Sequence, residues 1–406
     1  MNKQREYDMN LKKAKELFKL AHKNLTPKQV KDTHKAEHWL EKHGVEAKRT
    51  KSGFEFSEER MNFSSYLYEC YVFDRYLDFL LEYDMKLDVI QPDQPTQASW
   101  GDIKKGFDQA KDPASRKTHA KEGRKGRKSK LLGAEGSNPK IAKESESVPE
   151  FATKGLSLSP SDESGRVNTC SCATKECRAA CLNKAGRGAM SSVQKARLAK
   201  TDFMIDKPHQ FMSMLHDEID AHHRSATKKG KRAAVRLNVV SDIPYEKLHP
   251  EIFHEHPDVQ FYDYTKIHGR LMNPDGSPKQ LPKNYHVTLS STGVHKESNW
   301  KHVRQHLDNG GVAAMVFAVP AGRGKKKGGD LPSHVFDKKT GKKYRVIDGD
   351  IHDHRHLDHI YNDAQAGEGL IAGLRIKGGK KMLEKAGDFA VKVPQGQTHV
   401  EVEDIH

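Results

Sequence analysis

Four cysteines lie close together near the middle of the chain. Cys170, Cys172, Cys177 and Cys181 follow the spacing C-x-C-x4-C-x3-C. Four thiolates from one short loop can enclose a soft metal centre, either a tetrahedral zinc ion or an iron–sulfur cluster. The alternatives are two disulfides or four unrelated thiols. Because the N-terminus has no apolar signal core, we expect a chain that is not secreted, and in such a chain the cluster favours a metal site.

The spacing also bears on which metal would bind. Zinc sites favour paired C-x2-4-C knuckles separated by a longer loop. Here all four cysteines fall in one short stretch, which favours an iron–sulfur cluster, with zinc as the alternative. Radical enzymes that use S-adenosylmethionine carry the motif C-x3-C-x2-C, which leaves one iron open. That motif is absent, so the spacing does not support S-adenosylmethionine as a cosubstrate.

Polar residues follow several predicted strands at the point where each strand ends. We expect Asp242 to act as a general acid/base or a ligand, Lys266 to hold an anion, and Asp350 to be a third chemical group. The alternative is that such Ser, Thr and Asp residues cap the helices that follow. Arginines within strands need an anionic partner. The candidate substrate-binding residues are Arg236, Ser241, Tyr264, Thr265, Ser290, Ser291 and Arg375.

The segment from Asp348 to His359 is the richest in histidine and aspartate. His352, His354 and His356 would share one face of an extended strand. Imidazole and carboxylate groups are good ligands for zinc, manganese or iron. The segment therefore permits a second metal site, and the alternative is a solvated loop.

The pattern of apolar stretches predicts the fold that must position these residues. Short apolar stretches alternate with amphipathic ones, which indicates βα units and a mostly parallel sheet. We expect an α/β domain with a partial or distorted (β/α) barrel-like sheet, and an open doubly wound sheet is the alternative. The cysteine loop would follow the first strand, where (β/α) folds place their sites. The predicted strands are 155–159, 233–241, 259–265, 285–291, 312–320, 344–350 and 371–378, and the predicted helices are 189–226, 246–256 and 296–309.

The rest of the chain predicts three further segments. Residues 1–90 have helical periodicity and would form a small module, in which Cys70 is a buried thiol. Residues 91–150 contain prolines and little apolar periodicity, which is typical of a flexible linker. Residues 151–393 would be the α/β domain with the cysteine cluster, and residues 394–406 a frayed tail.

Charge and composition argue against an integral membrane protein and raise the question of contact with nucleic acid. The 406 residues carry a net charge of +15, and 35% of them are hydrophobic. No apolar run approaches the roughly 18 residues that a membrane span needs, so we expect a cytoplasmic protein without a membrane partner. The basic run 116–130 could contact phosphate groups of nucleic acid, or could be a solvated tether.

Several motifs in order carry a resemblance to a known family. They are the cysteine-rich loop 170–181, RLNVVSDIP (236–244), PDVQFYDYTK (257–266), TLSS (288–291), DIHDHR (350–355) and GLRIKG (373–378). From about residue 154 to 393 the chain resembles the gene product 88 family of phage and mobile-element proteins. The resemblance implies a phage-encoded α/β protein with a cysteine cluster, and it implies no reaction.

These observations leave two function classes open. The first is an iron–sulfur enzyme that acts on nucleic acid or nucleotides, with Asp242, Lys266 and Asp350 as its chemical groups. The second is a protein that binds nucleic acid or a host protein and carries structural zinc. A structural virion component is a third interpretation, which the polar strand ends and the four cysteines make least favoured.

Overall fold

The computed structural model describes residues 47–50, 53–56, 98–125, 129–133, 147–294, 298–322, 328–377 and 380–403. The chain divides into two units, Met1–Tyr68 and Glu69–His406, which we treat separately. In the first unit, β1 (Ala47–Thr50) and β2 (Gly53–Phe56) pair in antiparallel fashion. The helices that we expect in residues 1–90, and Cys70, lie outside the described residues.

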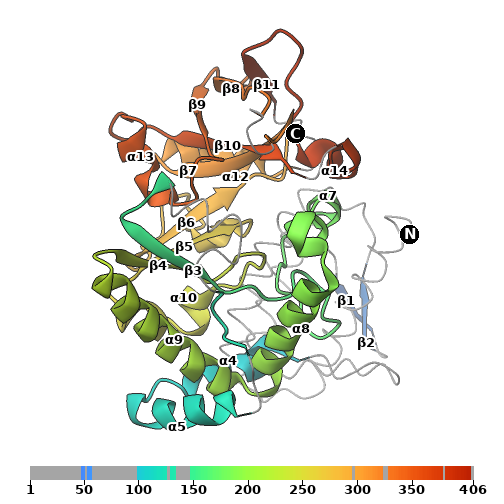
Figure 1. Ribbon diagram of the computed structural model, residues 1–406. Helices are drawn as coiled ribbons and strands as arrows, with labels where there is room; N and C mark the ends of the chain where they lie inside the picture. Colours follow the sequence, from blue (N-terminus) through green and yellow to red (C-terminus); the bar gives the residue numbers. More distant parts are fainter. Residues whose placement is uncertain are drawn as a thin grey trace. The chain divides into compact units, whose positions relative to one another are not determined.

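The second unit is built on a mostly parallel sheet (Figure 1). In the described residues the sheet has nine strands in the order β11-β8-β9-β10-β7-β6-β5-β4-β3. β8 runs antiparallel to β9, and every other neighbouring pair is parallel. The strands are β3 (Phe151–Gly155), β4 (Arg232–Arg236), β5 (Gln260–Thr265), β6 (Tyr285–Ser290), β7 (Val312–Pro320), β8 (His334–Asp337), β9 (Lys343–Asp348), β10 (Leu370–Ile376) and β11 (His399–Val402).

The order of the strands places the helices on one face. β3, β4, β5, β6 and β7 lie side by side in chain order. Right-handed connections that always step in the same direction put their helices on the same face of the sheet. This is the winding of a (β/α) barrel, but the described strands form an open sheet with β3 and β11 at its edges. The α/β prediction is confirmed, and the sheet does not close into a barrel.

The helices differ from the prediction mainly at their boundaries. The expected helix 189–226 is two helices, because Pro208 lacks a backbone N–H and disfavours helical geometry at the residue before it. Lys207 separates them, with φ at −141°. The helices are α4 (Trp100–Asp108), α5 (Pro113–Arg124), α7 (Lys175–Ala179), α8 (Ser191–Asp206), α9 (Pro208–Lys228), α10 (Tyr245–Leu248), α11 (Glu251–His254), α12 (Trp300–Asp308), α13 (Asp358–Tyr361) and α14 (Lys380–Ala386), with short 3-10 turns at η1 (Leu182–Lys184), η2 (Gly186–Ala189), η3 (His268–Arg270), η4 (Arg355–Leu357) and η5 (Gly387–Phe389).

Helices α4 and α5 occupy part of the segment where we expect a flexible linker. The Ser99 side chain caps α4, and Asp112 caps α5. Ile103 and Phe107 on α4 are buried at helical spacing, and Phe107 stacks on Phe211 of α9. These few apolar residues suffice to fix α4 on the core. Residues 98–125 therefore differ from the solvated segment that the prolines and the low apolar content suggest.

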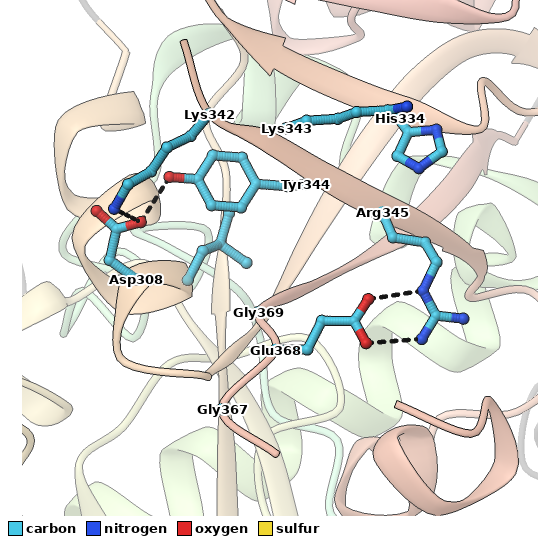
Figure 2. Close-up of a pocket in the computed structure, with 10 residues that line it drawn as sticks. Asp308, His334, Lys342, Lys343, Tyr344, Arg345, Gly367, Glu368 and Gly369 are labelled. Carbon is cyan, nitrogen blue, oxygen red and sulfur yellow. Dashed lines mark hydrogen bonds and ion pairs between the residues drawn. The ribbon is translucent and has the colours of Figure 1, made fainter. Parts of the chain in front are cut away.

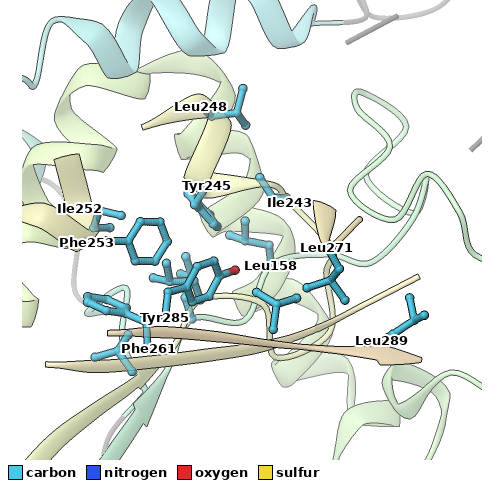
Figure 3. Close-up of a cluster of buried hydrophobic side chains, with 14 of the residues drawn as sticks. Leu158, Ile243, Tyr245, Leu248, Ile252, Phe253, Phe261, Leu271, Tyr285 and Leu289 are labelled. Carbon is cyan, nitrogen blue, oxygen red and sulfur yellow. The ribbon is translucent and has the colours of Figure 1, made fainter. Parts of the chain in front are cut away.

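The main core lies between the helices and one face of the sheet (Figure 3). Side chains alternate between the two faces of a strand, so Phe261 of β5 and Tyr285 of β6 both point to the helix side. Phe253 of α11 contacts both, with ring centroids 5.0 and 4.2 Å apart. The labelled residues of this cluster are Leu158, Ile243, Tyr245, Leu248, Ile252, Phe253, Phe261, Leu271, Tyr285 and Leu289.

Additional chain covers the end of the β3 edge of the sheet, and a strand from the predicted tail forms the other edge. At the β3 edge, Leu132 forms an antiparallel bridge with Leu156, and Gly133 N–H donates to the Gly155 carbonyl at 2.9 Å. The Glu218 carboxylate of α9 accepts hydrogen bonds from the backbone N–H groups of Leu131 and Leu132 and holds this segment in place. At the other edge, β11 lies within the predicted tail and pairs with β8.

No helix in the described part of the chain is both long and apolar enough to cross a membrane.

The burial of α4 gives a direct test of its packing. We expect Phe107→Ala to lower the free energy of unfolding by about 3–5 kcal/mol, because a fully buried ring leaves a cavity. Gln109→Ala, at an exposed neighbouring position, should change it by less than about 0.5 kcal/mol. Urea denaturation of the full chain measures both values. Equal stability of the two variants would show that α4 does not pack against the core.

Candidate site at the carboxyl edge of the sheet

The cysteine loop lies against the carboxyl end of β4, as the sequence predicts. The Asp242 N–H donates to the Thr169 carbonyl at 2.7 Å, and the Cys170 thiol donates to the Val240 carbonyl at 3.5 Å. These two hydrogen bonds join the loop to the segment that follows β4. The cysteines therefore lie at the edge where parallel strands place their polar ends.

Three of the four cysteines in the loop carry free thiols. Cys170, Cys177 and Cys181 are free and partly buried. Burial, together with the nearby Asp242, Cys177 and Cys181, raises the pKa of the Cys170 thiol to about 12. Burial also raises the pKa of Cys181. The three thiols therefore lie within electrostatic reach of one another, and the buried ones keep their protons at neutral pH.

Cys172 differs from the other three cysteines. Its side chain is buried, with 3% of its surface exposed, and it does not carry a free thiol. Cys172 follows Cys170 by two residues, but its side chain lies in the protein interior, whereas Cys170 is partly exposed. Its role as a fourth metal ligand stays a prediction.

Lys266 lies beside the thiols. Its ammonium group lies near the Cys177 side chain and is 5.4 Å from the centroid of the Phe389 ring. Burial alone would lower the pKa of Lys266, but Cys177, Asp242 and Cys170 outweigh it and the pKa lies above its ordinary value. The structure thus brings two predicted residues, Asp242 and Lys266, next to the cysteines.

The donor set fits some metal centres better than others. In the described ranges, no group of three His, Cys, Asp or Glu residues is arranged to hold a metal ion. A zinc ion needs each sulfur at about 2.3 Å, so the thiols do not form a ready-made zinc site. An iron–sulfur cluster is a larger object whose cysteine ligands bind separate irons. The donors that the structure brings into this loop are three partly buried thiols.

Asp242 is held by a buried arginine that the sequence analysis missed. Asp242 Oδ2 accepts a hydrogen bond from the Lys266 backbone N–H at 2.8 Å, and Oδ1 pairs with Arg270 Nη1 at 2.6 Å. Arg270 is 1% exposed and also forms two hydrogen bonds to Glu246, at 2.7 and 2.9 Å. With both oxygens engaged, Asp242 fixes the turn that carries Lys266.

A second buried carboxylate, Asp263, shares the Tyr285 hydroxyl with Arg270. Asp263 accepts hydrogen bonds from the Asn238 backbone at 2.6 Å and from the Tyr285 hydroxyl at 3.0 Å. Burial raises the pKa of Asp263 to about 6, and the nearby Arg270 and Arg236 oppose that rise. No pattern in the strand QFYDYT distinguishes Asp263 as a buried acid, because its partners come from distant residues.

Several other predicted site residues make local contacts. The Ser241 hydroxyl donates to Asn238 Oδ1 at 2.9 Å, and Thr265 Oγ1 accepts from the Ile267 N–H at 3.0 Å. Ser291 Oγ bonds the backbone of Gly293, and the Ser290 carbonyl accepts from Asn299 Nδ2. These contacts match the turn and capping role that was the alternative interpretation.

Asp350 and Arg375 form a separate ion cluster. Asp350 Oδ2 accepts from the backbone and the guanidinium of Arg375 at 3.0 and 3.1 Å, and Lys377 lies 3.3 Å from Oδ1. β6 and β7 lie between β5 and β10 in the sheet. Three strand spacings amount to roughly 14 Å, so Asp350 does not join Asp242 and Lys266.

Arg236 and Tyr264 meet on the face of the sheet opposite the helices. Arg236 Nη1 pairs with Asp353 Oδ2 at 2.8 Å, and the Tyr264 hydroxyl donates to Asp353 Oδ1 at 3.1 Å. The Arg236 guanidinium also lies 4.7 Å from the centroid of the Tyr264 ring. Asp353, which the sequence analysis did not select, therefore joins the histidine-rich segment to β4 and β5.

The three predicted histidine ligands have different surroundings on this face. His354 lies between the rings of Phe151 and Tyr262, at 4.7 and 4.8 Å, and its Nε2 contacts Thr153 Oγ1 at 3.1 Å. His352 Nδ1 contacts Arg355 Nη2 at 3.3 Å. Burial lowers the pKa of His354 to about 3 and those of His352 and His356 to about 4. The segment packs neutral imidazoles onto the sheet.

A pocket of about 390 Å³ opens at the amino ends of the strands, on the side of the sheet away from the cysteine loop (Figure 2). Its residues come from the amino ends of β8, β9 and β10 and from the end of α12. Asp308 accepts from Lys342 at 2.8 Å and from the Tyr344 hydroxyl at 2.7 Å. Arg345 pairs with Glu368 through two hydrogen bonds at 2.8 and 3.0 Å. These charges compensate one another, and the pocket contains none of the predicted site residues.

The buried histidines predict how stability depends on pH. A histidine whose pKa falls on folding stabilises the protein while it is neutral, and that contribution is lost as pH falls below about 6.5 toward the folded-state pKa. We expect His354→Asn to make the loss of stability between pH 6.5 and 4 shallower by about 1.4 kcal/mol per pH unit. Urea denaturation at several pH values measures the slope.

The control for this experiment is His254→Asn, at an exposed position of α11. This variant should keep the slope of the parent protein. A His354→Asn protein with an unchanged slope would show that His354 is not buried in its neutral form.

Comparison with known proteins identifies one family. A family model described as Gene product 88 matches residues 114–385, which is more than half of the chain. The match includes α5, which lies before the region of resemblance in the sequence analysis. No curated protein matches the chain, and no solved structure matches it.

Proposed function

The chain belongs to the Gene product 88 family, and from this premise we propose that it is an iron–sulfur enzyme that acts on nucleic acid or nucleotides. One observation carries the proposal. Three free thiols, Cys170, Cys177 and Cys181, lie at the carboxyl edge of parallel strands beside Lys266 and Asp242. In (β/α) folds this edge carries the active site.

The surroundings of the thiols favour a cluster over a single ion. All three donors are sulfur, which suits soft metals and iron–sulfur centres. Lys266 would balance the negative charge of the thiolates and of the cluster. When bound, the cluster would supply electron transfer or an iron open to substrate. Cys172 does not carry a free thiol in this structure, so it could serve as a fourth ligand only after reduction to a thiolate and a turn toward the other three.

The neighbouring residues have distinct roles in this proposal. Lys266 holds an anionic group of the substrate or the cluster through its ammonium group. Asp242 is a positioning residue, because its two oxygens fix Arg270 and the Lys266 backbone. Asp350 belongs to another ion cluster, so we assign it no part in the chemistry.

A second candidate function rests on charge alone. The chain carries a net charge of +15, and α5 exposes Lys117 and Lys121 within the basic run 116–130. A protein that binds phosphate groups through this run and carries structural zinc would account for both the charge and the cysteines. We place the protein in the cytoplasm in either case, because its thiols need a reducing compartment.

Metal analysis tests the cluster. Protein purified without oxygen should contain iron and acid-labile sulfide and should absorb broadly near 400 nm, on the order expected for a thiolate-bound cluster. Cys170→Ser, Cys177→Ser and Cys181→Ser should each lose most of the iron, whereas Cys172→Ser tests the fourth position. One zinc per chain would support the second candidate, and a metal-free protein would overturn both.

The charge of Lys266 has its own test. The potential of an iron–sulfur cluster depends on nearby charge. We therefore expect Lys266→Met to keep the iron but to lower the reduction potential, as measured by a dye-mediated titration. Lys392→Met, at an exposed position, should leave the potential unchanged. Equal reduction potentials in the parent protein and both variants would contradict the placement of Lys266 beside the cluster.

A further inference from the structure

An exposed apolar surface begins immediately after Cys181. In the described part of the chain, Leu182, Met190 and Leu198 are 40, 53 and 38% exposed. The other large hydrophobic residues with comparable exposure are Ile351, within the histidine-rich segment, and Ile360 and Tyr361, which directly follow it. A single exposed leucine on a protein surface needs no explanation, whereas several exposed apolar residues in one stretch can mark a binding site. The stretch 182–198 has three.

The same stretch is strongly basic. Residues 175–200 contain seven Lys or Arg residues and one acidic residue, Glu176. Lys184, Arg187 and Lys195 are exposed, and Lys184 pairs with Glu163 at 3.5 Å, which is a weak surface contact. The surface therefore presents positive charge together with apolar side chains.

Polar contacts of the buried residue Asn183 join η1 to α8. The Asn183 side chain is 2% exposed. Its carbonyl accepts from Gln194 Nε2 at 3.2 Å, and its side-chain oxygen accepts from Arg197 Nη1. These contacts fasten η1, which carries Leu182, to α8, which carries Leu198. We refer to Leu182, Lys184, Arg187, Met190, Lys195 and Leu198 as the η1–α8 surface.

We propose that the η1–α8 surface binds single-stranded nucleic acid and leads it to the thiols. This inference rests on the proposed function, because it names the substrate class of the same site. The exposed Lys184, Arg187 and Lys195 side chains can neutralise phosphates. The leucine and methionine side chains can contact bases, which only an unpaired strand exposes. Cys181 directly precedes the surface, so a bound strand would pass beside the cysteine loop.

Two other occupants fit the surface less well. A membrane-binding helix needs a continuous apolar face, and Leu198 is the one large apolar residue that α8 exposes strongly. A nucleic-acid duplex stacks its bases inside and would leave the apolar side chains without a partner. An unpaired strand uses both the charges and the apolar groups.

Charge reversal on the full chain tests the proposal. Binding of a fluorescein-labelled oligothymidine is measured by anisotropy at several salt concentrations. We expect the triple variant Lys184→Glu, Arg187→Glu, Lys195→Glu to bind at least tenfold more weakly. Each lost phosphate contact should reduce the slope of log affinity against log salt by about 0.7. Met190→Ser with Leu198→Ser should weaken binding severalfold without changing that slope.

The matched control is Lys117→Glu with Lys121→Glu on α5, which also reverses exposed lysines. This control should bind like the parent protein. Loss of binding in the control but not in the triple variant would overturn the proposal in favour of the basic run 116–130. Tighter binding to a duplex of the same length, or binding to phosphatidylserine vesicles but not to the oligonucleotide, would also overturn it.

A further comparison separates this inference from the proposed function. Binding is repeated with the Cys170→Ser protein, which should lack the cluster. Retained binding in that variant supports the surface independently of the metal. A protein that holds iron and sulfide but binds no oligonucleotide at low salt would overturn the inference and leave the cluster standing.

Discussion

The buried guanidinium of Arg270 organises the carboxyl edge of the sheet. Burying a charge costs several kcal/mol unless it is paired and hydrogen-bonded. Arg270 meets that requirement with Asp242, Glu246 and the Tyr285 hydroxyl. These partners come from the end of β4, from α10 and from β6, so one charge sets the positions of three elements. Through Asp242 the same network holds the Lys266 turn and the cysteine loop.

The order of strands β3 to β7 explains why the helices and the histidine-rich segment lie on opposite faces of the sheet. All connections from β3 to β7 step in one direction, so the helices cover one face. The opposite face is covered by the histidine-rich segment, with Asp353 on Arg236 and His354 between Phe151 and Tyr262. A chain segment thus occupies the space that would be the interior of a closed barrel. The cysteine loop lies beyond it at the carboxyl edge.

Local patterns in the sequence predict much of this fold. The apolar stretches at 259–265, 285–291 and 312–320 each contain an observed strand, and the stretch at 233–241 overlaps β4. They also place Asp242 and Lys266 beside the cysteine loop. Arg270, Asp263 and Asp353 were not predicted, because their roles depend on partners that are far away in sequence. Helix α4 was missed because three apolar residues in nine give a weak pattern, and β8 and β11 were missed because each strand has only four residues.

The segment that bridges Leu132 to Leu156 has a consequence for the protein in crowded conditions. An open sheet ends in strands whose outer N–H and C=O groups can recruit a strand from another molecule, which starts aggregation. Gly133 N–H occupies one such group, the Gly155 carbonyl at the end of β3, and Leu132 bridges Leu156 next to it. Glu218 holds the covering segment through two backbone N–H groups. A single carboxylate on α9 thus helps an unclosed sheet avoid polymerising along its β3 edge.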